Sequence, residues 1–167
     1  MTYSPFLANP EADKTQSTLG VPANLNVNTR IPCTSVTHTG ITNANGQLVI
    51  SSGLSVLLTA SCFTTRQVTS TNYGVPGYLV FQWYDVTNST WLGKDCQIST
   101  ALYNNSNRYL SQSFARCVLI TTAQTTVELR IKAITSGSTH VNEFYDGATN
   151  FHDYEWTGSP WYSILSF

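Results

Sequence analysis

The stretch that decides the fold is Tyr-Leu-Val-Phe-Gln-Trp-Tyr-Asp-Val-Thr-Asn-Ser-Thr-Trp-Leu-Gly, residues 78 to 93. Its first seven residues alternate between the two sides of an extended chain: Leu79, Phe81 and Trp83 lie on one side, and Tyr78, Val80, Gln82 and Tyr84 on the other. This period of two predicts a β-strand whose faces meet different surroundings. We expect this strand to be central in its sheet.

A turn follows the strand. Residues 85 to 90, Asp-Val-Thr-Asn-Ser-Thr, carry Asp and Asn side chains that bond back to nearby backbone groups, and an apolar run resumes at Trp91. The pattern predicts a β-hairpin. Asp85 and Asp95 flank this hairpin, and we interpret them as turn residues rather than as the acid pair of a glycosidase.

Strand patterns recur along the rest of the chain. The further predicted strands are 33–39, 47–50, 54–63, 94–99, 109–120, 126–134 and 161–167, with a turn at Asn43-Ala-Asn-Gly46 before the second. Residues 54–63 and 116–120 are apolar enough to predict buried strands. We find no helical pattern. About eight short strands separated by turns predict an all-β fold, a two-sheet sandwich or jelly roll.

The clearest alternation lies in residues 127 to 133. The residues expected to point inward are Val127, Leu129, Ile131 and Ala133, and those expected to point outward are Glu128, Arg130 and Lys132. An alternation of apolar and charged residues predicts a strand that is buried on one face only.

Composition limits the class of protein. A chain of 167 residues suits one domain. Charged residues make up 10%, so neutral polar side chains must provide much of the solubility. The net charge of -1 provides no basic field for phosphate backbones or anionic lipid, so we expect neither nucleic acid nor a membrane surface as a partner. No apolar window approaches the length of a membrane span, and the first residues lack a secretory signal pattern.

Residues 1–30 differ from the rest. They contain Pro5, Pro10 and Pro22 and show no sustained periodicity, which predicts an extended N-terminal arm before a domain at 31–167. A disordered tail is the alternative interpretation. Because a purely solvating tail has little use for apolar side chains, we expect three of them, Tyr3, Phe6 and Leu7, to anchor the arm on a neighbouring protein.

The chemistry-bearing residues do not form a catalytic pattern, so we expect no enzyme activity and no cofactor. Four widely spaced cysteines are interpreted as buried thiols: Cys33, Cys62, Cys96 and Cys117. A metal site was considered for the acids and histidines of one long connection, but their spacing matches no recognised site: His140, Glu143, Asp146, His152, Asp153 and Glu155. Recognition of a carbohydrate by exposed Trp, Tyr and Asn side chains remains open.

A resemblance can be named from these segments. Residues 53–61, 77–85, 91–93, 126–131 and 161–165 follow one another as do the strands of the C1q and tumour-necrosis-factor-like jelly rolls, in particular those on bacteriophage particles. The similarity spans about 33–167 and rests on a pattern of strands, not on an invariant motif. It implies a homotrimer that serves as a head decoration (cement) protein, a head fibre or a tail-fibre tip.

The sequence departs from the pattern of these jelly rolls in one respect. The arm stands where a collagen-like or coiled-coil stem would be, which favours a virion structural protein that binds the outer capsid surface directly, on the major capsid protein. The alternative is a fibre tip that binds a host receptor or glycan. In such trimers the outward side of strands 78–86 and 126–134, with the terminal strand, is expected at the three-fold axis. The expected interface residues are Gln82, Tyr84, Glu128, Arg130 and Tyr162.

Overall fold

The computed structural model describes residues 14–20, 26–67, 77–100, 108–134, 143–144 and 161–167. They form eleven strands and, within these ranges, no helix long and apolar enough to cross a membrane. The strands are β1 (Lys14–Thr18), β2 (Arg30–Ile31), β3 (Ile41–Ala44), β4 (Gln47–Ile50), β5 (Ser55–Gln67), β6 (Gly77–Asp85), β7 (Thr90–Thr100), β8 (Arg108–Ile120), β9 (Thr125–Ile134), β10 (Glu143–Phe144) and β11 (Trp161–Ser166). The all-β prediction is confirmed.

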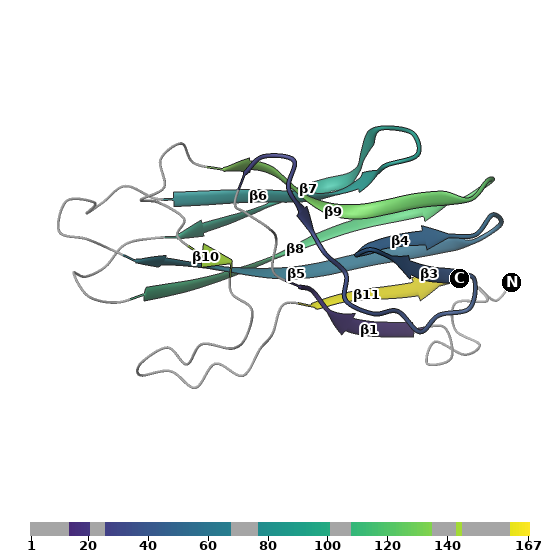
Figure 1. Ribbon diagram of the computed structural model, residues 1–167. Coiled ribbons are helices and arrows are strands. Elements are labelled where there is room, and N and C mark those ends of the chain that lie inside the picture. Colours follow the sequence, from purple (N-terminus) through teal and green to yellow (C-terminus); the bar gives the residue numbers. More distant parts are fainter. Residues whose placement is uncertain (1–13, 21–25, 68–76, 101–107, 135–142, 145–160) are drawn as a thin grey trace, which may run out of the picture.

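The strands form one curled antiparallel sheet with the order β1-β11-β5-β8-β7-β6-β9-β4-β3 (Figure 1). Two short strands lie beside this path, since β2 pairs with β9 and β10 with β5. The backbone pairing between β7 and β8 is narrow, because Lys94 and Arg116 are the one residue pair in register there. The sheet therefore has two halves that meet at this junction: β1, β11, β5 and β8 on one side, and β7, β6, β9, β4 and β3 on the other.

The predicted central hairpin is confirmed. Strands β6 and β7 pair from Asp85 and Thr90 outward, and β6 also pairs with β9 along its other edge. The Asp85 carboxylate accepts hydrogen bonds from the backbone N–H of Asn88 at 2.9 Å and from its side-chain amide at 2.8 Å. Asp85 is thus a turn residue, as its neighbours in the sequence indicate.

A second hairpin forms where Asn43-Ala-Asn-Gly46 predicts a turn. Strands β3 and β4 pair in register, and both residues between them have positive φ, 54° at Asn45 and 82° at Gly46. Two successive positive values are the requirement of the tight turn that matches the twist of a hairpin, which explains the Asn-Gly pair. The Asn43 side-chain oxygen accepts the Gly46 N–H at 3.0 Å and closes the turn.

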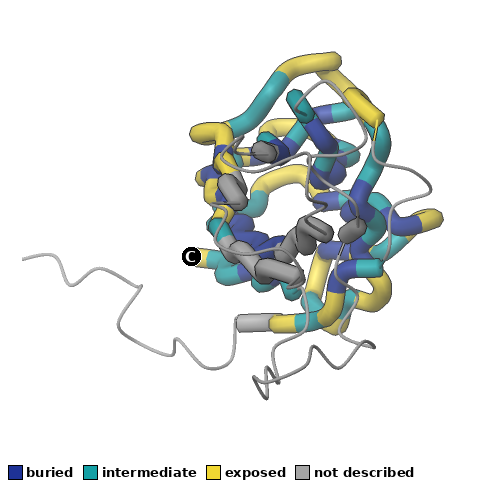
Figure 2. The backbone as a smooth tube through the Cα atoms, turned by 90° about the vertical axis from the view of Figure 1, so that its left-hand side faces the viewer, coloured by how far each residue is buried: buried dark blue, intermediate teal, exposed yellow. Residues whose placement is uncertain are grey.

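One core lies inside the curl, and both halves of the sheet supply it (Figure 2). Leu79, Phe81 and Trp83 of β6 are fully buried, as their alternation predicts. The indole N–H of Trp83 donates to the backbone oxygen of Ala115 on β8 at 3.4 Å, so this side chain spans the space between the two halves. Burying these large apolar groups provides the main driving force for the curl.

All four cysteines are buried in this core as free thiols, as we predicted. Burial removes the solvent that would stabilise a thiolate, and it raises the pKa of Cys33 and of Cys117 to about 12. The pKa of Cys62 is raised well above its usual value for the same reason. The thiols therefore serve as small apolar core residues at neutral pH.

The chain between β2 and β3 closes the gap between the two ends of the curled sheet. On one side, the backbone N–H of Cys33 donates to Gly46 at the β3–β4 turn. On the other side, the Thr34 N–H donates to the Thr18 carbonyl at 3.2 Å, and Leu19 bridges to Cys33. Hydroxyl pairs Ser17–Ser35 and Thr18–Thr34 reinforce this closure at 2.6 and 2.7 Å.

This closure changes the predicted boundary of the arm. Residues 14–20 were expected in the arm, but Lys14–Thr18 pairs with β11 along its whole length and Leu19 is a buried core residue. Arg30 and Ile31 likewise pair with β9. The prolines misled the prediction because they interrupt the periodicity on both sides of a short edge strand. Residues 1–13, with Tyr3, Phe6 and Leu7, lie outside the described residues.

Candidate interaction surfaces

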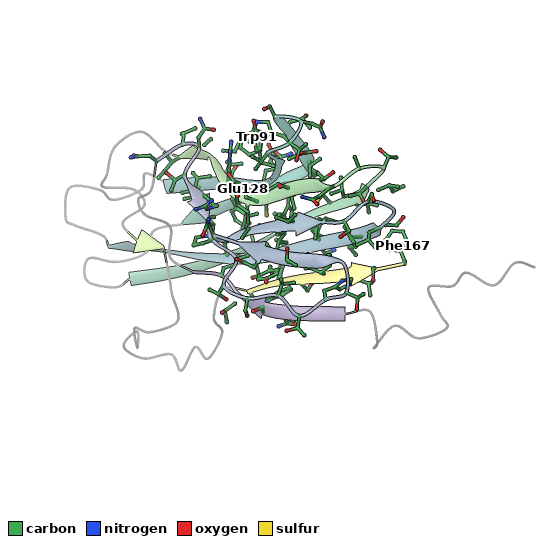
Figure 3. The ribbon with its side chains drawn as sticks, turned by 45° about the vertical axis from the view of Figure 1, so that its right-hand side comes forward. Trp91, Glu128 and Phe167 are labelled. Carbon is green, nitrogen blue, oxygen red and sulfur yellow. The ribbon has the colours of Figure 1, made fainter. Side chains whose placement is uncertain are left out.

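The outer side of β6 and β9 carries a cluster of charged, amide and aromatic side chains, which we call the arginine face. Its members are Arg30, Gln47, Gln82, Tyr84, Trp91, Asp95, Glu128, Arg130 and Lys132. Figure 3 labels Trp91 and Glu128 of this cluster, which lie together away from Phe167 at the end of the chain. Strand register explains the gathering, because Tyr84 lies opposite both Glu128 on β9 and Trp91 on β7.

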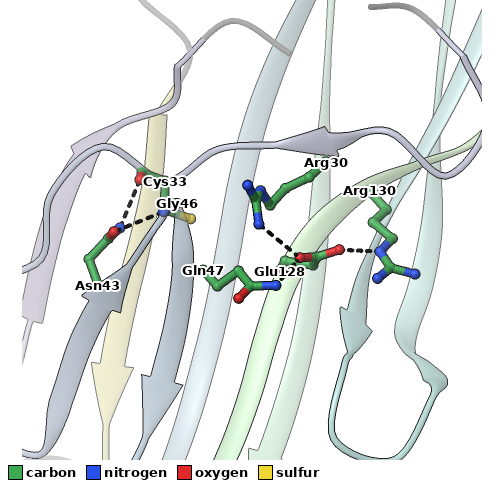
Figure 4. A network of polar contacts seen from close by, with 7 residues as sticks. All are labelled: Arg30, Cys33, Asn43, Gly46, Gln47, Glu128 and Arg130. Carbon is green, nitrogen blue, oxygen red and sulfur yellow. Dashed lines mark hydrogen bonds and ion pairs between the residues drawn. The ribbon is translucent and has the colours of Figure 1, made fainter. Parts of the chain in front are cut away.

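Glu128 is the centre of the cluster and is only 3% exposed (Figure 4). One carboxylate oxygen contacts Nε of Arg130, and the other accepts the side-chain amide of Gln47 at 2.6 Å and lies 3.7 Å from Arg30. The predicted outward direction of Glu128 is right, and side chains from β2, β4 and β9 itself cover its carboxylate. A buried carboxylate needs such partners, since an unpaired one is costly.

Cations lie over both aromatic rings of the face. The guanidinium carbon of Arg130 is 3.8 Å from the centre of the Tyr84 ring, and Nζ of Lys132 is 5.7 Å from the centre of the Trp91 ring. The two rings meet edge to face at 5.0 Å. Cation–π and edge-to-face contacts of this kind stabilise one arrangement of the side chains. The arginine face is therefore ordered by contacts within the single chain.

Lys132 and Gln82 extend the network along the sheet. Nζ of Lys132 donates to the Gln82 side-chain oxygen at 2.8 Å and to the Asp95 carboxylate at 3.0 Å. The Gln82 amide in turn donates to the backbone oxygen of Gly93 at 2.8 Å. Gln82 is buried, so its polar atoms are satisfied by the protein rather than by water.

Four of the five residues predicted for a trimer axis lie together on this face: Gln82, Tyr84, Glu128 and Arg130. Tyr162 does not. Its side chain is fully buried in the core on β11, so the prediction that Tyr162 points outward is wrong. The terminal strand forms as predicted, but its inward residues are Tyr162 and Ile164, and Trp161 and Leu165 are partly exposed.

The other half of the sheet has an apolar outer surface, which we call the β8 strip. Phe114, Val118 and Ile120 are 44%, 59% and 70% exposed, and with exposed Arg116 they occupy successive outward positions of β8. Soluble proteins expose single apolar residues freely, but a row of large ones along one strand marks an interaction surface.

Neighbouring strands widen the β8 strip. Val118 lies opposite Leu57 on β5, which lies opposite Leu165 on β11, and both leucines are partly exposed. At one end the rings of Phe114 and Trp161 lie 6.1 Å apart, and the Arg116 guanidinium is 5.9 Å from the Phe114 ring. The apolar surface thus crosses three strands.

This surface was not predicted from the sequence, because residues 116–120 are apolar enough to predict a buried strand. In the structure Ala115 and Cys117 are buried, but Val118 and Ile120 on the opposite face are exposed. An apolar run of this length has no polar alternation that would tell one face from the other. The outward Arg116 was the signal that one face of the strand is accessible.

Among the described residues no group of three or more His, Cys, Asp and Glu side chains is placed to hold a metal ion. Of the long connection considered for such a site, His140, Asp146, His152, Asp153 and Glu155 lie outside the described residues. The arrangement supports binding through side-chain contacts.

Comparisons with known proteins identify no relatives: no protein-family model matches this chain, and no curated protein is similar to it in sequence.

Proposed function

We propose that this chain is a structural protein that assembles as a homotrimer and decorates the outer surface of a virion capsid. The trimer and the capsid come from the resemblance to C1q and tumour-necrosis-factor-like jelly rolls. The strand order supports a two-sheet jelly roll, with β1, β11, β5 and β8 in one sheet and β7, β6, β9, β4 and β3 in the other. The narrow β7–β8 contact is where the two sheets would meet.

The β8 strip is the observation that carries this proposal. Its three exposed side chains would each contribute roughly 0.7 to 2 kcal/mol if an association buried their remaining exposed area, before the cost of association is subtracted. Leu57, Leu165 and Trp161 beside them would add to the buried apolar area. A surface of this kind, on a chain with little charge, favours contact with further copies of the protein over exposure to water.

The proposed subunit interface therefore moves from the arginine face to the β8 strip. On the arginine face Glu128 and Gln82 are buried and hydrogen-bonded within one chain, so a second copy has few of their polar groups left to pair. On the β8 strip the described apolar side chains face outward and gain from a partner. Association through the β8 strip removes apolar area from water, which is favourable. Association through the arginine face would have to break hydrogen bonds that already exist within the chain.

Attachment to the capsid is assigned to residues 1–13. Tyr3, Phe6 and Leu7 remain the proposed anchors on the major capsid protein, and one such segment would bind weakly after its ordering cost. Three segments on one trimer raise the effective concentration of each for its site on a symmetric shell. Modest contacts would then give stable decoration.

The mass in solution tests the subunit interface. Light scattering of the purified protein should give three times the 18.4 kDa mass of the chain. Val118→Asp places a charge in the middle of the β8 strip and should give the single-chain mass with unchanged β-sheet circular dichroism. Val27→Asp, at an exposed valine outside the strip, is the matched control and should stay trimeric. A wild-type protein of single-chain mass, or a trimeric Val118→Asp protein, contradicts the proposal.

A further inference from the structure

Two arginines of the arginine face hold part of their guanidinium groups toward solvent. Arg130 uses Nε on Glu128 and one flat side on the Tyr84 ring, and no contact is drawn from its two terminal nitrogens to the other residues of Figure 4. Arg30 lies directly opposite on β2, with its side chain 38% exposed. Because Glu128 and the Tyr84 ring hold the Arg130 group, its remaining donors are presented in one geometry.

The charges of this pair are not balanced by the described residues around it. Like charges directly opposite on paired strands repel each other, and Glu128 is the one carboxylate that the described contacts place between Arg30 and Arg130. The nearby Lys132 is paired with Asp95. One positive charge is therefore in excess here, although the whole chain carries a net charge of -1. An anion drawn to this place must respond to the local pair, not to the field of the protein.

We infer that the arginine face binds carboxylate groups on the surface of a partner protein. A guanidinium edge matches the two oxygens of a carboxylate. Glu128 neutralises one of the two positive charges of Arg30 and Arg130, and a second carboxylate bound between them would neutralise the other. The inference deepens the proposed function and rests on it, since the partner surface would belong to the decorated shell.

A protein surface is a better match than a sugar. A bound sugar ring packs on an open aromatic face, and on this surface Arg130 lies over one face of the Tyr84 ring and Lys132 over one face of the Trp91 ring. What the face still offers to a ligand is charge and planar donors. Carboxylates on an acidic protein surface use both.

Binding to poly-L-glutamate tests the inference on the full chain without a shell. We expect saturable binding by calorimetry at 50 mM salt that weakens at 300 mM, because the contact is ionic. Arg130→Gln and Arg30→Gln should each weaken binding by roughly tenfold. Lys94→Gln removes the same charge from an exposed position on β7 outside the face, and it should change affinity less than about twofold.

Polysialic acid, a polysaccharide that carries carboxylates, is the parallel probe. Binding of polysialic acid but not of poly-L-glutamate, with loss in Arg130→Gln, would assign the face to a glycan and overturn the inference. Equal loss in Lys94→Gln and Arg30→Gln would overturn it as a specific site. Arg30→Gln keeps the test valid if Arg130→Gln unfolds, because Arg30 makes the longer contact with Glu128. If the carboxylate-binding inference fails but the protein still sediments with shells through residues 1–13, the proposed capsid decoration is not contradicted.

Discussion

Gly93 lies so close to Cys117 that a Cβ atom on Gly93 would be 2.6 Å from the Cys117 Cβ, and closer still to the carbonyl oxygen of Arg116. This is the place where β7 approaches β8, next to Lys94 and Arg116, the one ladder pair in register between these two strands among the described residues. Gly93 also has a φ of 66°, which favours glycine. The two halves of the sheet can thus approach this closely only because residue 93 is a glycine, which has no Cβ atom.

Gly93→Ala should therefore destabilise the fold by about 2 to 4 kcal/mol, because the added methyl group must push β8 away and the left-handed backbone adds strain. Calorimetry should show a melting temperature lower by about 5 to 15 °C. Gly53→Ala is the matched control, since Gly53 has a φ of 80° but nothing within 4 Å of an added Cβ. It should lose only about 1 to 2 kcal/mol. Equal losses in the two variants would show that the β7–β8 contact does not matter.

The buried thiols predict how stability depends on pH. Folding raises the pKa of Cys33 and Cys117 from 9.0 to about 12, so the unfolded chain releases these protons first. Stability should be insensitive to these thiols below about pH 9 and fall as the pH rises toward 12, by up to about 1.4 kcal/mol per pH unit for each thiol.

Urea unfolding at a series of pH values measures this effect. Cys117→Ala should give a shallower decrease of stability above pH 9 than the wild type, even if its stability at pH 7 is lower. A decrease of identical slope in both proteins would mean that Cys117 ionises as readily in the folded state as in the unfolded chain.

The sequence predicts those parts of the fold in which one face of a strand differs from the other. Residues 79 to 83 and 127 to 131 alternate, and their inward residues are buried as predicted. The turns at Asn43–Gly46 and Asp85–Thr90 were predicted because their chemistry is local. The β1 strand was not predicted, since five polar residues gain their place only by pairing with β11 far along the chain.

The arginine face and the β8 strip also differ in how far the sequence predicts them. The alternation of two strands shows which of their residues point outward. The sequence could therefore group four residues of the arginine face: Gln82, Tyr84, Glu128 and Arg130. That Glu128 is buried depends on Arg30 and Gln47, which come from separate segments and are not marked by any pattern. The β8 strip could not be predicted, because the sequence does not distinguish an apolar residue that packs in the core from one that packs against another molecule.

Tyr162 provides a test of an unsatisfied polar group. Its hydroxyl is buried and makes no hydrogen bond within the described residues, and the Ser17 hydroxyl that lowers its pKa is paired with Ser35 at 2.6 Å. Burial raises the pKa of Tyr162 to about 12, and the proximity of Ser17 opposes this rise. Tyr162→Phe removes the desolvated oxygen and keeps the ring, so we expect the free energy of unfolding to stay equal or to rise by about 1 kcal/mol.

Denaturant unfolding of the two proteins measures this difference. Tyr162→Leu is the companion variant, and it should lose stability because it leaves a cavity in place of the ring. A clear loss in Tyr162→Phe would show that the hydroxyl has a partner in solution, such as a buried water molecule.

Two N-terminal deletions separate attachment from folding. Removal of residues 1–13 leaves β1 intact, so the protein should keep its melting temperature within about 2 °C. Removal of residues 1–20 takes away the strand that pairs with β11, the buried Leu19 and the hydroxyl contacts to Thr34 and Ser35. Loss of the Leu19 side chain alone costs about 2 to 5 kcal/mol, so the melting temperature should fall by about 5 to 15 °C.

The shorter deletion then tests the capsid proposal. Protein that lacks residues 1–13 should stay trimeric by light scattering but should no longer sediment with the particle, because the anchors Tyr3, Phe6 and Leu7 are gone. Retained decoration by this protein would place attachment elsewhere, with the arginine face as the next surface to mutate. If the shorter deletion failed to fold, residues 1–13 would belong to the domain, and the boundary at Lys14 would be wrong.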